Sequence, residues 1–183
     1  MMHSYAAYWL GDRTAKDEGR LTLNPLAHID VVTTIILPVV MVLMHMPPIL
    51  AAKPVPFDPR SVRFGDYGAA LVALAGPFTN LVLAGAGALA FRMFGAGGEL
   101  TGHIFLVFTA VNISFFVFNM IPIPPLDGSR LLYAFAPEPL RRVMRTIESF
   151  GFFAILAFFL LLFPLIRDTV VTINVSLLQF LLF

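Results

Sequence analysis

The sequence predicts an all-α protein that crosses the membrane several times as a bundle of helices. Composition is the first indication: of 183 residues, 58% are hydrophobic, the mean hydropathy is +0.86 and only 13% are charged. That charged share is about half of what an ordinary globular domain carries. A soluble domain of this length could not bury so much apolar surface in one core. The second indication is that the few charges cluster, which leaves long uncharged stretches between them.

The net charge and the cysteine count exclude several classes of function. A formal net charge of +1 provides no strong field for binding a nucleic acid. We therefore expect the lipid bilayer and membrane proteins as partners, and no nucleic acid. The chain contains no cysteine, which excludes disulfides, thiolate zinc sites and cysteine nucleophiles. Any metal must be held by His, Asp, Glu or water.

The uncharged stretches predict the individual elements in chain order. Residues Ser4–Leu10 have the pattern of a helix end that Gly11 closes. A membrane-spanning helix needs roughly 17–25 apolar residues. The further stretches that we expect to enter the membrane, the last of them short, are Val31–Ala52, Tyr67–Ala90, Thr101–Leu126, Ser149–Ile166 and Thr169–Phe183. The small residues of Ala84–Ala88 indicate a close helix-packing face.

The stretch Val31–Ala52 differs from the others because it contains three prolines, which interrupt the helical hydrogen-bond ladder. It either spans the membrane with a kink or enters and returns on the same side. Cytoplasmic loops hold an excess of Lys and Arg. With a re-entrant segment at 31–52, ten of the twelve cations share one side and only Arg92 and Arg167 lie opposite. We therefore expect the re-entrant threading, with the ten cations towards the cytoplasm.

The segment Asn119–Gly128 is the most informative motif of the sequence. An apolar helix runs into three prolines within four positions, which favours an extended backbone that lacks donors. Unpaired carbonyls at membrane depth are tolerated only beside a cavity or inside protein. Asp127 follows at once, and an ionisable residue at the margin of a span is a functional-site candidate. The alternative is that Asp127 only caps a following helix, Gly128–Phe135.

This segment resembles the signature of the site-2 protease family of intramembrane zinc metallopeptidases. The resemblance covers roughly residues 3 to 135. The other segments that match in order are Leu10–Asp12, Thr14–Lys16, Gly19–Pro25, His28–Asp30, Ala52–Pro56 and Ala73–Asn80. The resemblance implies that Asp127 is the third zinc ligand and that Asn119 positions substrate or stabilises the oxyanion. It also implies a zinc endopeptidase that cleaves membrane-protein segments. We expect this enzyme in the bacterial inner membrane, with its active site towards the cytoplasm.

The family's His-Glu-x-x-His motif is present only in part. Residues i and i+4 of a helix face the same way, so the two histidines can bind one metal, while the glutamate acts as general base. His3 lies where the second histidine belongs, and the first histidine and the glutamate would precede Met1. We therefore expect one membrane domain over residues 1–183 that lacks the N-terminal helix with the first half of the motif. The alternative is an inactive family member that binds other membrane proteins.

The threading and the predicted metal site support each other. His3 lies two helical turns before Gly11, about 12 Å along a helix, and Asp127 follows the end of its own span. The two can share one zinc only if those two helix ends face the same side of the membrane. They do so when residues 31–52 are re-entrant, and not when every stretch crosses.

Two further groups of side chains have structural interpretations. We expect Arg141, Arg142 and Arg145 to meet the lipid headgroups. His45 and His103 lie in apolar runs, so we expect them to be packed or interfacial and not to bind metal.

Overall fold

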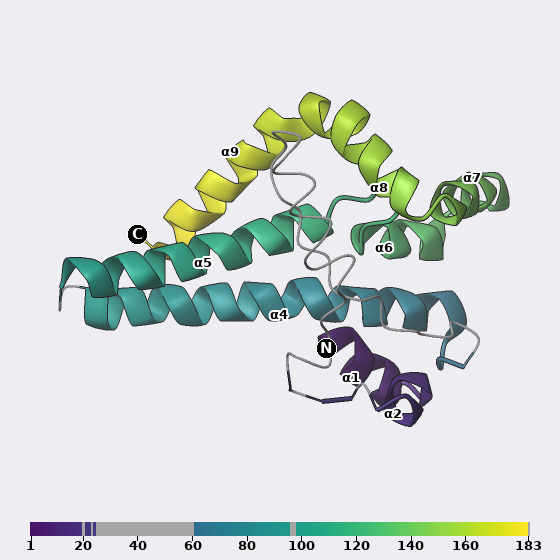
Figure 1. Cartoon of the computed structure of the whole chain (residues 1–183), viewed down its shortest axis with the longest axis horizontal. Coiled ribbons are helices and arrows are strands. Elements are labelled where there is room, and N and C mark those ends of the chain that lie inside the picture. Colours follow the sequence, from purple (N-terminus) through teal and green to yellow (C-terminus); the bar gives the residue numbers. More distant parts are fainter. Residues whose placement is uncertain (20, 23, 25–60, 96–97, 183) are drawn as a thin grey trace. The chain divides into compact units, whose positions relative to one another are not determined.

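The computed structural model describes residues 1–19, 21–22, 24, 61–95 and 98–182. Every regular element among them is a helix (Figure 1), so the prediction of an all-α membrane helix bundle is confirmed. The predicted re-entrant segment 31–52, with His45, lies outside the described residues. The chain divides into two compact units, Met1–Gly65 and Asp66–Phe183, and a single membrane domain over the whole chain stays a prediction.

The described helices follow one another along the chain, and the connections from α4 onward are short. In order they are α1 (Met2–Trp9), α2 (Thr14–Asp17), α4 (Gly65–Phe94), α5 (Glu99–Asn119), α6 (Gly128–Phe135), α7 (Glu138–Ser149), α8 (Phe152–Ala157), the π-helical turn η4 (Phe158–Leu162) and α9 (Phe163–Leu182). Among the described residues, three helical runs are long and apolar enough to cross a membrane: Gly65–Phe94, Glu99–Asn119 and Phe153–Leu182.

In the first unit, a tight turn joins α1 to α2. Gly11 has a φ of +110°, in the region that favours glycine, and it ends α1 as the sequence predicts. The next residue, Asp12, is buried, and its Oδ1 accepts hydrogen bonds from the amide and the hydroxyl of Thr14. The amide of Arg63 donates a 2.8 Å bond to the carbonyl of Leu10. The carboxyl end of α1 is therefore fixed by polar contacts within its own unit.

In the second unit, α4 and α5 lie side by side as an antiparallel hairpin (Figure 1). Small residues make their contact possible. Ala84 and Ala88 are buried, and a Cβ at Gly87 would lie 2.6 Å from the hydroxyl of Thr109 and 2.7 Å from the ring of Phe108. Close approach through small residues is how apolar helices associate in a bilayer, and the predicted packing face at Ala84–Ala88 is confirmed.

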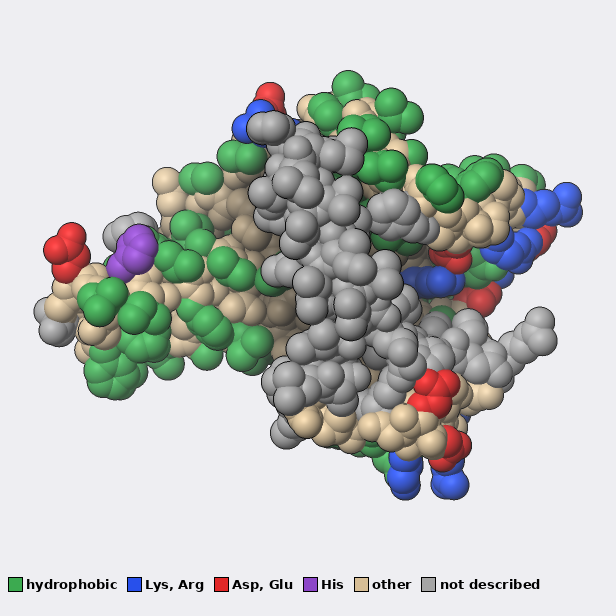
Figure 2. All heavy atoms as spheres, viewed as in Figure 1, with side chains coloured by type: hydrophobic (Ala, Val, Ile, Leu, Met, Phe, Trp, Pro, Cys, Tyr) green, Lys and Arg blue, Asp and Glu red, His purple; other side chains and the backbone are tan. Residues whose placement is uncertain are grey.

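Large apolar side chains cover the outside of α4, α5 and the run from α8 to α9 (Figure 2). Val82 on α4, Leu165 on α9 and Phe180 near its end are each more than two-thirds exposed. Monomeric soluble proteins rarely expose apolar surface so extensively. These faces suit the hydrocarbon core of a bilayer, as a membrane helix bundle requires.

The last two predicted stretches form one helical run in the structure. The run continues through α8, η4 and α9, so Arg167 and Asp168 lie inside α9 and the expected loop at these charges was wrong. Charged residues interrupt an apolar stretch, but they leave the backbone hydrogen bonds of a helix intact. Figure 1 shows this run arching over α5. The run contains the π-helical turn η4 and, two residues later, Pro164, and π-bulges and prolines are the usual causes of kinks.

The second half of the arch returns to the hairpin. Leu177 of α9 packs against a core in which Ala84, Ile113 and Val117 are buried. The Nε atom of Arg92, in the last turn of α4, donates a 3.4 Å hydrogen bond to the carbonyl of Leu182. The three long helical elements of this unit therefore share one core.

Candidate functional site

The loop from Asn119 to Gly128 carries the chain from the end of α5 into α6. It is more compact than the predicted extended backbone. The amide of Ile123 donates to the carbonyl of Ile121 at 2.9 Å, and the amide of Leu126 donates to that of Ile123 at 3.0 Å. The prolines cannot donate, but the residues between them can, so the loop folds into successive turns.

Gly128 closes this loop against the end of α5. A Cβ at this position would lie 2.6 Å from the carbonyl carbon of Met120 and 2.7 Å from the carbonyl oxygen of Ile121. Only glycine permits such an approach of two backbones. Asn119 directly precedes Met120, and Asp127 directly precedes Gly128. The contact between Gly128 and Met120 therefore places Asn119 and Asp127 at the same end of α5. The family motif in the sequence includes this glycine. The structure gives the physical reason for a glycine here, which is the contact with Met120, eight residues earlier in the chain.

Asp127 occupies the N-cap position of α6, with φ −59° and ψ −36°. Every residue of α6 is described, and the Asp127 side chain makes no capping hydrogen bond with this helix. The first turn is held by backbone bonds instead, since the amides of Ser129 and Arg130 donate to the carbonyls of Leu126 and Asp127, each at 3.0 Å. The helix Gly128–Phe135 has the predicted bounds, but capping does not account for the Asp127 side chain.

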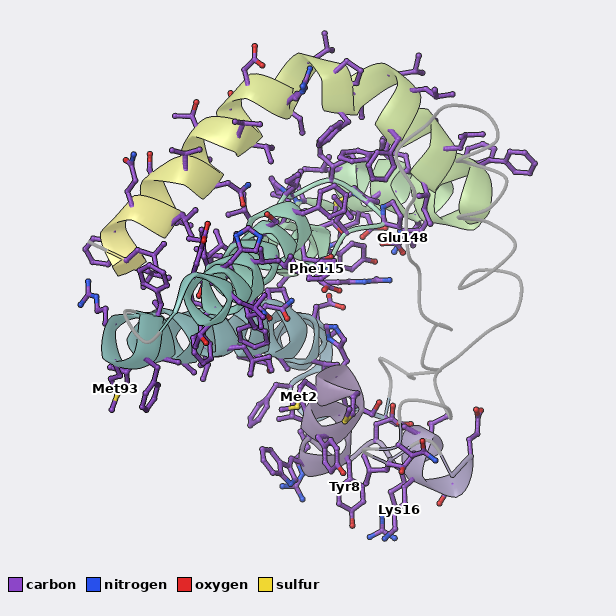
Figure 3. The ribbon with its side chains drawn as sticks, turned by 60° about the vertical axis from the view of Figure 1, so that its left-hand side comes forward. Met2, Tyr8, Lys16, Met93, Phe115 and Glu148 are labelled. Carbon is purple, nitrogen blue, oxygen red and sulfur yellow. The ribbon has the colours of Figure 1, made fainter. Side chains whose placement is uncertain are left out.

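Asn119 is half-buried at the last position of α5. Its side-chain nitrogen donates a 3.0 Å hydrogen bond to the carbonyl of Phe115, one turn back (Phe115 is labelled in Figure 3). The amide thus binds its own helix in this conformation. The same nitrogen carries a second hydrogen, which can be donated to a substrate while this bond is kept.

His3 lies in the first turn of α1 and is half-buried. It belongs to the first unit and Asp127 to the second, so their sharing of one metal stays a prediction. Among the described residues, no group of three or more His, Asp or Glu side chains is placed to hold a metal ion. The third histidine of interest, His103, is exposed near the start of α5.

The α6–α7 pair carries most of the second unit's positive charge. Figure 2 shows Lys and Arg side chains gathered over α7. Each of its three arginines has a partner within the protein, and their contact with lipid headgroups stays a prediction. Arg145 donates to the hydroxyl of Tyr133 at 2.9 Å and to the carboxylate of Glu138, while Arg141 binds three acceptors. The Nε atom of Arg142 lies 3.8 Å from the carboxylate of Glu138, and the Arg142 side chain remains 75% exposed.

The contact between Arg145 and Glu138 also shifts the pKa of each of the two groups. The hydrogen bond from Arg145 lowers the pKa of Glu138 below the usual value for a glutamate. The same bond raises the pKa of Arg145. Both groups therefore stay charged over the physiological range, and each holds the other in place.

An apolar groove of about 480 Å³ lies beside the loop. Ile123 and Pro124 of the loop form one wall, and Phe150, Ala157 and Leu161 belong to the facing side. All of its lining residues are apolar. The sequence did not indicate this groove, because the two walls are far apart along the chain.

Two curated proteins are similar to this chain over most of its length. The chain is 35% identical over 167 residues to "Putative zinc metalloprotease YwhC" of Bacillus subtilis, an alignment that covers 87% of this chain and 73% of YwhC. It is 29% identical over 158 residues to "Putative zinc metalloprotease Rip2" of Mycolicibacterium smegmatis, covering 82% of this chain and 57% of Rip2. No family model and no solved structure matches the chain. At this identity and coverage, the chain belongs to the zinc metalloprotease family that includes YwhC.

Proposed function

We propose that this protein is a membrane-embedded zinc endopeptidase of the site-2 protease type, which cleaves membrane-spanning or membrane-bound segments of other proteins. The names of its two relatives support a metalloprotease, and three apolar helices support a site within the membrane. The observation that carries the proposal is the contact of Gly128 with Met120. It holds Asp127 and Asn119 at one end of a membrane-crossing helix.

We assign zinc to Asp127 and His3. A carboxylate oxygen and an imidazole nitrogen are both ordinary zinc ligands, and the Asp127 side chain does not serve as a helix cap. When bound, zinc supplies a Lewis acid that polarises the peptide carbonyl and acidifies water. The second hydrogen of the Asn119 side-chain nitrogen would be donated to the oxygen on which negative charge develops.

The substrate segment must be unwound locally, because an intact helix shields its carbonyls with its own hydrogen bonds. The apolar groove beside the loop would accept the large apolar side chains of such a segment. Its wall at Ile123 and Pro124 belongs to the same loop as Asp127. Side chains bound there would lie next to the residue that we assign to the metal.

The direct test is Asp127→Ala, with Asp168→Ala as the matched control. Asp168 is an exposed acidic residue of the same unit, inside α9. We expect Asp127→Ala to lose zinc affinity and proteolysis of a membrane-protein substrate, and the control to keep both. Unchanged zinc affinity and proteolysis in Asp127→Ala would show that the assignment is wrong.

A second candidate is a family member that binds other membrane proteins without cleaving them. The observation that favours it is that the 183 residues contain no His-Glu-x-x-His sequence. The two candidates differ in a single assay with the unmodified protein and a membrane-protein substrate. Capture of the substrate with no cleavage, equal in Asp127→Ala, indicates the binding protein, and cleavage indicates the enzyme.

A further inference from the structure

We propose that Arg141 and Asp66 are positioning residues for Asp127. Their contact holds the far end of α6 to the first turn of α4 and so sets the orientation of the helix that begins next to Asp127. This inference rests on the proposed function for the role of Asp127 itself. Its structural part, the anchoring of α6, rests only on contacts within the second unit.

Arg141 joins three elements through one guanidinium group. Its Nε donates to the carbonyl of Ala136 at 2.8 Å and one terminal nitrogen donates to that of Ala134 at 3.2 Å. The other terminal nitrogen binds Oδ2 of Asp66 at 2.7 Å. The carbonyls at a helix end have no partner within the helix, and a cation there is favoured by the helix dipole. An α7 side chain thus caps the end of α6 and ties it to α4.

An aromatic contact reinforces this anchor. Tyr67, the residue after Asp66, meets Phe135 edge to face, with ring centroids 5.5 Å apart. The guanidinium of Arg141 also lies over the ring of Tyr133, 5.2 Å from its centre. The first turn of α4 therefore contacts α7 through an ion pair and the last turn of α6 through a ring pair, from the adjacent positions Asp66 and Tyr67.

The two ends of α6 are held in different ways. At its start, Gly128 packs directly against the backbone of Met120 and Ile121. That end of α6 is therefore fixed, and the helix can only turn about it. An eight-residue helix is about 12 Å long. A shift of its far end by about 3 Å would turn it through roughly 14°. That rotation falls in the range of about 10–20° at which a functional constellation leaves its productive geometry. Among the described side chains, Arg141 restrains this turn towards α4 together with the ring contact between Phe135 and Tyr67.

Other contacts bind α6 only to α7. Arg145 reaches Tyr133, and Arg130 forms a 3.1 Å ion pair with Glu148 (labelled in Figure 3). Without the contacts of Arg141 with Asp66 and of Phe135 with Tyr67, these bonds would let α6 and α7 move together relative to α4. The helices α6 and α7 would therefore move as one unit relative to α4, and Asp127 lies at the end of α6 about which they would turn.

Arginine suits this position better than lysine. A guanidinium presents five donors in a rigid planar fork, whereas an ammonium is a compact charge on a flexible stem. Lysine at 141 would keep the pairing with Asp66 but could not reach the carbonyls of Ala134 and Ala136 in the same geometry. We expect Arg141→Lys to rescue part of what Arg141→Gln loses.

The anchoring is tested by distance measurement in the full chain, reconstituted in phospholipid bilayers. The chain has no cysteine, so nitroxide labels at Leu71→Cys on α4 and Leu131→Cys on α6, both exposed positions, report on these helices alone. We expect Arg141→Gln and Asp66→Asn to broaden or shift the distance distribution by a few ångström. The control Arg142→Gln alters the next residue of α7 and should leave the distribution unchanged.

The positioning role is tested by the affinity for zinc and by the visible spectrum of bound Co²⁺, in protein without labels. We expect Arg141→Gln and Asp66→Asn to weaken zinc about tenfold and to alter the cobalt spectrum, with Arg141→Lys between them and the unmodified protein. Far-ultraviolet circular dichroism checks that each variant is folded. If Arg141→Gln does not fold, Asp66→Asn and Arg141→Lys carry the test.

Two results would overturn the inference. An unchanged distance distribution in Arg141→Gln and Asp66→Asn would show that the pair does not anchor α6. A broadened distribution with unchanged zinc affinity and cobalt spectrum would show that the orientation of α6 is not used at the site. Failure of the proposed function is a separate observation, since it is seen as unchanged zinc affinity in Asp127→Ala.

Discussion

The α4–α5 hairpin and the α6–α7 pair are held together by different physical means. In the hairpin, small residues such as Gly87 and Ala84 let two apolar helices approach closely. In the α6–α7 pair, arginine side chains donate to hydroxyl, carbonyl and carboxylate groups of the neighbouring helix. Lipid tails provide no hydrophobic drive between apolar helices, so close packing must hold them. Charged contacts suit helices at the membrane surface.

Asp127 lies where these two kinds of packing meet. The loop that carries it begins at the end of α5 and is closed by Gly128, a backbone contact of the hairpin kind. The helix that it precedes is held at its far end by Arg141, a polar contact of the other kind. The apolar α4–α5 hairpin and the polar contacts of the α6–α7 pair thus determine together where the Asp127 carboxylate lies.

The largest effect is expected for Gly128→Ala. The atoms that a Cβ would meet are backbone atoms of Met120 and Ile121, which cannot move without unwinding the end of α5. We expect a loss of about 3 kcal/mol in the free energy of unfolding, together with loss of zinc affinity. Thermal unfolding and a zinc titration measure both. A Gly128→Ala protein with normal stability would show that α6 does not approach α5 as described.

A smaller effect is expected for Gly87→Ala, where the atoms in the way belong to the side chains of Phe108 and Thr109. Side chains give way more readily than backbone, so we expect a loss of about 1–2 kcal/mol in stability. Zinc affinity should not change, because the contact is in the scaffold. The matched control is Gly85→Ala, where a Cβ would meet no heavy atom within 4 Å. Equal destabilisation by both substitutions would contradict the packing at Gly87.

The smallest effect is expected for the contact between Glu138 and Arg145, and it depends on pH. The pKa of Glu138 is lowered in the folded protein, so its contribution to stability is present above the ordinary pKa of a glutamate. That contribution is lost as the pH falls through the lowered value. Between about pH 6 and about pH 3, the Tm of the unmodified protein should fall more than that of Glu138→Gln. Parallel curves for the two proteins would contradict the contact.

The sequence predicted the elements that local chemistry determines. The helix Gly128–Phe135 was found with its predicted bounds, because three prolines and an Asp-Gly pair leave few places where it could begin. The end of α1 at Gly11 was predicted for the same kind of reason. The joining of the last two stretches was missed, because Arg167 and Asp168 lie on a helix surface without interrupting its backbone.

The contacts that hold the candidate site could not be read from the sequence. Arg141 was expected at the headgroups, as basic residues beside a span usually are, yet its acceptors lie on α4 and in the carboxyl end of α6. Asp66 is 75 residues away from it along the chain. No spacing rule links such residues, since only the folding of α6 and α7 against α4 brings them together. The roles of His3 and Asn119 remain predictions from the motif.

The central claim, that residue 127 binds the catalytic metal, is tested most directly by Asp127→Cys titrated with Co²⁺. Thiolate sulfur is a good ligand for such ions, and no other cysteine exists in the chain. A thiolate bound to Co²⁺ gives a strong near-ultraviolet charge-transfer band that carboxylate and imidazole ligands do not give. We predict this band in Asp127→Cys and its absence in the control Asp168→Cys. Binding of Co²⁺ by Asp127→Cys without the band would contradict the claim.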